Sequence, residues 1–90
     1  MAEIKVTRLS QTAFRVEVKE GSSKTVHDVT ASSADIDRYG NGAPAERLIE
    51  VSFQFLLERE PKESILRSFE LPVIEHYFPE YPQKISQRLV

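Results

Sequence analysis

The first third of the chain alternates apolar and polar residues, which is the pattern of strands that cover a core with one face. Phe14, Val16 and Val18 alternate with charged residues, so an extended backbone places the three apolar side chains on one side. The earlier run 4–7 alternates in the same way, and the segment 10–12 between the two runs is short and polar. We therefore expect two neighbouring antiparallel strands.

A third strand is predicted after Gly21, a residue that can adopt the positive φ of a tight turn. The segment 24–30 that follows is rich in β-branched residues, which favour strands. Val26 and Val29 are three positions apart rather than two, so we expect a bulge at 27–28 or a strand that ends there.

Helices are predicted for most of the remaining chain. Ser32 or Ser33 can cap a short helix over 34–39, which Gly40 ends. The residues 45–59 are mostly good helix formers, and their apolar side chains cover more than half of the helical wheel. A helix of this kind is buried on most sides, so we expect it at the centre of the domain with the sheet on one flank.

Prolines divide the C-terminal part into short segments. Ile65, Leu66 and Phe69 are spaced as on one face of a short helix, and further helices are expected after Pro72 and after Pro82. The predicted fold class is α+β: a three-stranded antiparallel β-meander packed against a long central helix, with several short C-terminal helices. With 90 residues, the chain is expected to form one domain over positions 1–90.

Composition excludes several classes of function. The chain has no cysteine, which removes disulfides, thiolate metal sites and cysteine nucleophiles, and its net charge of −2 is dispersed along the sequence. No apolar run is long enough for a secretory signal or for a membrane span. We expect a cytoplasmic protein whose stability comes from packing.

The stretch from Phe55 to Tyr81 carries a resemblance. It resembles a segment of small uncharacterised bacterial proteins that begin with strands and end with a proline-punctuated helical run, and it covers about a third of the chain. The resemblance implies a bacterial cytoplasmic protein. It transfers no activity, ligand or catalytic residue, because its apolar, proline and charged positions describe a fold rather than a site.

Candidate catalytic and metal-binding residues are few. Of the two histidines, His27 is expected on the solvent side of its strand, and His76 would need zinc ligands from distant carboxylates. No serine stands in a Gly-x-Ser-x-Gly elbow, and the glycines at 40 and 42 lack the lysine of a phosphate-binding loop. We therefore expect no enzyme, no metal site and no cofactor.

Aromatic residues gather near the C-terminus and favour a contact surface for another protein or for a second copy. A domain of this size cannot surround every large ring, and a half-exposed tyrosine beside an arginine is typical of protein interfaces. The predicted contact residues are Tyr77, Tyr81, His76 and Arg67, with Tyr81 held partly outward between two prolines. The predicted function is non-catalytic binding or assembly.

Nucleic-acid binding is the alternative function. The outer face of the predicted sheet displays Lys5, Arg15, Lys19 and Lys24, a thin basic strip. A helix-turn-helix is not favoured, because the helix around Ile74 carries glutamates and a histidine but no lysine or arginine to contact phosphates or bases.

Overall fold

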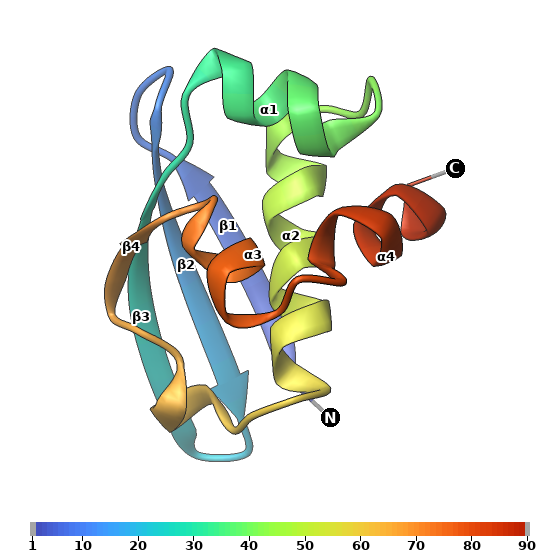
Figure 1. The fold of residues 1–90 in the computed structure, drawn as a ribbon. Helices are drawn as coiled ribbons and strands as arrows, with labels where there is room; N and C mark the ends of the chain where they lie inside the picture. The colour runs from blue at the N-terminus through green and yellow to red at the C-terminus, as the bar shows by residue number, and fades with distance from the viewer. Residues whose placement is uncertain (1, 90) are drawn as a thin grey trace.

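The computed structural model describes residues 2–89, which form a four-stranded mixed sheet with helices against one face (Figure 1). The sheet order is β1-β2-β3-β4. The domain is therefore of the α+β class, as the sequence predicts. No helix in the described part of the chain is long and apolar enough to cross a membrane.

The first three strands form an antiparallel meander. β1 (Glu3–Arg8) pairs with β2 (Ala13–Glu20), which in turn pairs with β3 (Ser23–Thr30). The inner face of β2 is apolar, as its alternation predicts, and its side chains Phe14 and Val16 are fully buried.

β3 corrects the sequence prediction of a bulge or an early end at 27–28. Its register with β2 is continuous, with Val18 opposite Thr25 and Val16 opposite His27. The inward positions therefore belong to Thr25, His27 and Val29, and Val26 lies on the outer face. The apolar spacing was misleading because two polar side chains occupy buried positions, where hydrogen bonds satisfy them.

A fourth strand replaces the helix expected around Ile65. The chain makes one 3-10 turn, η1 (Lys62–Ser64), and then extends into β4 (Ser68–Glu70), which runs parallel to β3. The amide of Asp28 donates to the Arg67 carbonyl at 2.7 Å, just before β4 begins. An apolar spacing over five residues does not distinguish a helix from a strand, and the pairing with β3 decides it.

Helix α1 (Ser33–Gly40) begins at a capping box, and Ser32 is the cap. The Asp35 amide donates to Ser32 Oγ at 3.1 Å, and the Ser32 amide donates to the Asp35 carboxylate at 3.0 Å. The helix ends at Asn41, whose φ of 52° is left-handed.

Helix α2 (Ala45–Leu57) lies against the inner face of the sheet (Figure 1). It ends two residues before the predicted position 59. Its buried side chains include Leu48, Phe53 and Phe55, which fill the core between sheet and helices. Two shorter helices, α3 (Val73–Tyr77) and α4 (Tyr81–Arg88), follow β4.

Candidate docking groove

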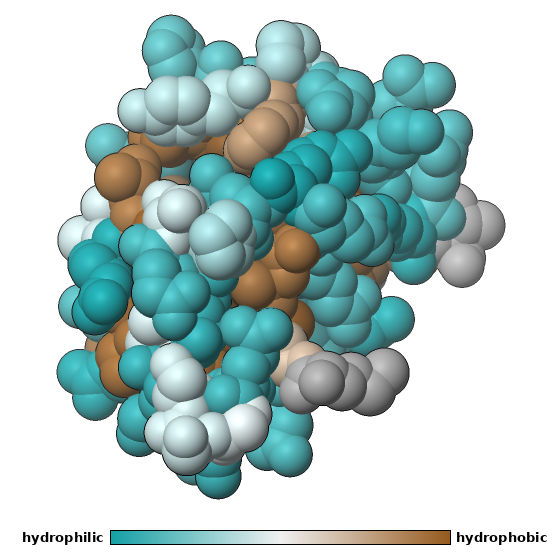
Figure 2. All heavy atoms as spheres, turned by 90° about the horizontal axis from the view of Figure 1, so that it is seen from below, coloured by the Kyte–Doolittle hydropathy of each residue, from teal (hydrophilic) through white to brown (hydrophobic). Residues whose placement is uncertain are grey.

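An apolar groove opens where the end of α2, the segment before β4 and helix α3 meet. We call it the docking groove; its volume is about 230 Å³. The buried side chains of Ile65, Phe69 and Ile74 form its floor. Seen from the end of the molecule at which α2 stops, apolar atoms show near the middle of the view between hydrophilic ones (Figure 2).

Two exposed apolar side chains stand at the rim of the docking groove. Leu66 is 47% exposed and Tyr77 is 63% exposed. Among residues 2–89, only Leu9 and Val26 are other large apolar side chains with comparable exposure, and both lie outside the groove. Two of the four exposed large apolar side chains in residues 2–89 thus stand together at the groove.

His27 holds the wall of the groove that contains Leu66. Its Nδ1 lies 2.8 Å from the Leu66 carbonyl oxygen, and its Nε2 lies 2.8 Å from Thr25 Oγ1. A carbonyl only accepts, so Nδ1–H donates to Leu66, and in the neutral ring Nε2 accepts from the Thr25 hydroxyl. Burial lowers the pKa of His27 below its ordinary value of 6.5, which keeps the ring in this neutral form.

The expectation that His27 faces solvent is therefore wrong. The ring is fully buried and packs against Phe53, with 5.3 Å between the ring centroids. Its Nδ1 hydrogen bond joins β3 to a carbonyl 39 residues later in the chain. This contact could not be read from the sequence, because nothing in the local pattern places Leu66 beside β3.

Helix α3 is tied to α1 on the other side. The Tyr39 hydroxyl donates to the Glu75 carboxylate at 2.7 Å, and the Arg38 guanidinium lies 3.0 Å from the same oxygen. Burial and the hydrogen bond to Glu75 raise the pKa of Tyr39 to about 12, so the phenol keeps its proton. Glu75 is thereby occupied on the side of α3 that faces α1.

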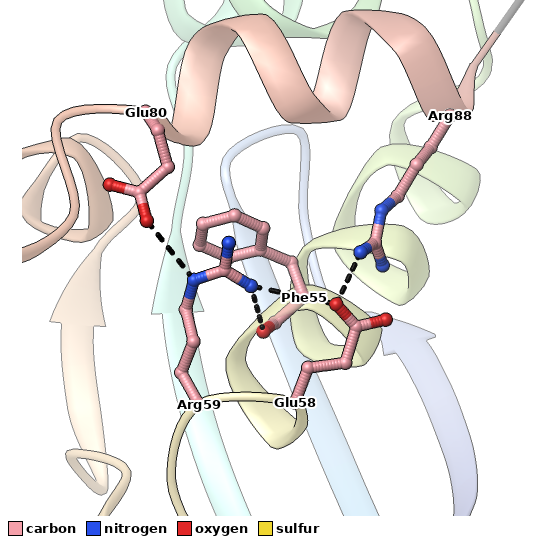
Figure 3. A network of polar contacts seen from close by, with 5 residues as sticks. All are labelled: Phe55, Glu58, Arg59, Glu80 and Arg88. Carbon is pink, nitrogen blue, oxygen red and sulfur yellow. Dashed lines mark hydrogen bonds and ion pairs between the residues drawn. The ribbon is translucent and has the colours of Figure 1, made fainter.

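A second polar network fixes the end of α2 against α4 (Figure 3). The guanidinium of Arg59 lies 3.6 Å from the ring centroid of Phe55, and its Nε donates to Glu80 at 3.3 Å. Glu58 binds Arg88 of α4, and this contact lowers the pKa of the Glu58 carboxyl. The network fixes the end of α2 at Leu57, three residues before the groove residue Glu60.

The predicted contact residues are only partly brought together. Tyr77 lines the groove, and His76 is exposed beside it with its ring edge-on to the tyrosine at 5.5 Å. Arg67 is exposed just before β4 but does not line the groove. The sequence did not identify Leu66 and Glu60 as site residues, since neither differs locally from an ordinary surface residue.

Tyr81 contradicts the prediction of a partly outward ring. It is fully buried, and its hydroxyl lies 2.7 Å from Ser52 Oγ of α2. Tyr81 begins α4 and faces α2, because the small side chain of Ser52 leaves room for the ring and gives its hydroxyl a partner. It belongs to the core and not to a contact surface.

The basic residues of the sheet share the outer face but do not form an uninterrupted strip. Lys24 pairs with Glu17 at 3.2 Å, and Arg15 lies 3.8 Å from Asp28. Acidic residues thus alternate with the basic ones on that face. Within residues 2–89, no three histidine, aspartate or glutamate side chains are grouped so that they could hold a metal ion.

No protein-family model matches the chain, and the comparisons with curated proteins and with solved structures found no significant match. Function therefore has to be argued from the groove itself. Its apolar floor, its exposed rim at Leu66 and Tyr77 and its single charged residue are the observations that bear on it.

Proposed function

We propose that this domain is a non-catalytic binding module that contacts a protein partner through the docking groove. The supporting observation is the pair of exposed apolar side chains, Leu66 and Tyr77, above a buried apolar floor. Exposed apolar surface that is contiguous and framed by polar residues is typical of protein contact sites. Tyrosine at such a rim offers a large ring at small entropic cost.

The shape of the groove favours a protein segment over a small molecule. Pockets for drug-sized ligands enclose roughly 300–1,000 Å³ and aim several polar groups at the ligand. The docking groove is smaller, at about 230 Å³, and the polar side chains among its lining residues are Glu60, Ser64 and the hydroxyl of Tyr77. One or two apolar side chains of a partner suit this space better than a polar metabolite.

The outer face of the sheet is the less favoured contact surface. Its charged side chains pair with one another while they remain exposed to solvent, and fully buried interface cores are depleted of charge. Nucleic-acid binding there, the alternative function, has in its favour the adjacent Lys19 and Lys24, although Lys24 is paired with Glu17. A gel shift with mixed DNA and RNA that weakens steeply with salt would support that alternative instead.

Two leucine truncations test the proposal as a matched pair. Leu66 at the groove and Leu9 in the β1–β2 turn have nearly equal exposed fractions, 47% and 50%, so both changes to alanine should affect stability little and similarly. We expect proteins captured by the wild-type domain from its native cells to be lost with Leu66→Ala and retained with Leu9→Ala. Equal retention by both variants would contradict a contact at the groove.

A further inference from the structure

Glu60 is the one charged residue among the described residues that line the docking groove. It is half-buried, at the end of the turn that follows α2. In the part of the chain that the structure describes, no basic side chain forms an ion pair with it. A carboxylate in apolar surroundings without a counter-ion favours a cation from outside.

The neighbouring bases along the chain are both held elsewhere. Arg59 stacks on Phe55 and donates to Glu80, as Figure 3 shows. Lys62 is buried, and its ammonium group lies 2.6 Å from Glu63 and 3.3 Å from Glu20 of the β2–β3 hairpin. Neither base can turn to Glu60 without giving up these contacts.

We infer that the segment docking in the groove carries a large apolar side chain next to a lysine or arginine. The apolar side chain would rest on Ile65 and Ile74 between Leu66 and Tyr77, and the base would pair with Glu60. An engineered cavity of about 150 Å³ holds a benzene molecule, so about 230 Å³ accommodates a leucine or phenylalanine side chain. The inference rests on the proposed function and specifies the chemistry of its partner.

A second copy of this chain fits the groove less well. Both exposed leucines of the chain stand next to an arginine, but Leu66 forms the rim of the groove itself, so the leucine that a second copy would offer is Leu9, which follows Arg8. That guanidinium, however, donates to the carbonyls of Ser10 and Gln11 in its own turn, at 3.1 and 2.9 Å. It is therefore not free to reach Glu60 of another molecule.

Synthetic peptides test this chemistry on the full chain by NMR. The probes are a short peptide with adjacent leucines flanked by lysines, the same peptide with glutamates for lysines, and the same peptide with serines for leucines. We expect only the lysine–leucine peptide to give saturable shifts of the amide signals of Leu66, Ile74 and Tyr77. Equal binding of the glutamate–leucine peptide would overturn the inference.

Charge reversal at the groove sharpens the test. We expect Glu60→Gln to weaken the binding of the lysine–leucine peptide by about two- to fivefold, the range of a single exposed ion pair. Glu60→Lys should invert the preference, so that the glutamate–leucine peptide binds better. Glu3→Lys is the matched control, because Glu3 lies on β1 at the opposite edge of the sheet and should leave the preference unchanged.

The possible failures are distinguishable. If both leucine peptides bind at the groove and Glu60→Lys changes neither, the inference is wrong while the proposed function stands. If no peptide shifts the groove signals, the inference is overturned, and the paired leucine truncations decide the proposed function separately. The dispersion of the NMR signals shows whether each variant is folded. If Glu60→Lys does not fold, Glu60→Gln, which keeps the shape of the side chain, takes its place in the test.

Discussion

His27 Nδ1 and the carbonyl oxygen of Leu66 lie 2.8 Å apart, so a buried imidazole on β3 holds the backbone of a residue whose side chain forms the groove rim. The imidazole ring itself is fully buried and packs against the ring of Phe53. The geometry of the candidate site thus depends on a residue that does not itself line the groove.

The free energy of unfolding should therefore decrease as the pH is lowered through the range in which histidine titrates. The folded-state pKa of His27 is below 6.5, so the unfolded chain binds a proton more readily than the folded one. The stability that the neutral ring contributes is complete above pH 6.5 and is lost as pH falls from there toward the folded-state pKa. Urea denaturation at several pH values between 7.5 and 5.5 measures this loss.

Two variants assign the effect to one histidine. His76→Gln should keep the loss of stability, because His76 is exposed. His27→Gln should be less stable at neutral pH and should show a nearly flat profile between 7.5 and 5.5. A wild-type loss that persists in His27→Gln would contradict the assigned tautomer and its role.

The buried hydroxyl pair of α2 and α4 gives a second prediction. Ser52 Oγ donates to the Leu48 carbonyl at 2.7 Å, so the Tyr81 hydroxyl donates to Ser52 Oγ. Ser52→Ala should cost about 1–3 kcal/mol because it leaves the buried phenol unsatisfied, whereas Ser86→Ala on the exposed face of α4 should cost little. Chemical denaturation measures both changes.

A double variant separates the hydrogen bond from packing. Once Ser52 is alanine, Tyr81→Phe removes a hydroxyl that has already lost its partner. The double variant should therefore be more stable than the two single losses added together predict. Strict additivity would mean that the two hydroxyl groups do not interact.

Replacement of Arg59 by lysine should destabilise the domain. Its planar guanidinium stacks on Phe55 and reaches the Phe55 carbonyl and Glu80 together, which a lysine ammonium cannot do. We expect Arg59→Lys to cost about 0.5–2 kcal/mol of unfolding free energy. Arg47→Lys is the matched control: within residues 2–89, Arg47 pairs only with Glu50 on the surface of α2, and we expect a change within about 0.5 kcal/mol. Equal losses in thermal or urea denaturation would refute the structural role of the stacked ring.

The strands with strict alternation could be predicted from the sequence, and the elements that depend on distant partners could not. Phe14 and Val16 mark β2 because its buried positions are apolar. β3 was misread because Thr25 and His27 are buried polar residues, satisfied by a hydrogen bond to each other and by one to a carbonyl far along the chain. β4 has three residues and exists only through its pairing with β3.

Prediction of the candidate site from the sequence meets the same limit. The rim residue Tyr77 could be proposed from the aromatic composition, but the groove arises from the meeting of α2, the segment before β4 and α3. Tyr81 was placed on the surface because of its flanking prolines. Its spacing of four from Ile85, which is also buried, was the signal for a helix face directed at the core.

Site-specific photo-cross-linking tests the central claim most directly. A photoreactive benzophenone side chain replaces Tyr77 at the groove rim in one variant and Val26 on the outer sheet face in another, and both are expressed in the native cells. We predict cross-links from position 77 to a discrete protein, competed by excess unmodified domain, and none of comparable yield from position 26. Cross-links from position 26 alone, or equal products from both positions, would contradict the account of the docking groove.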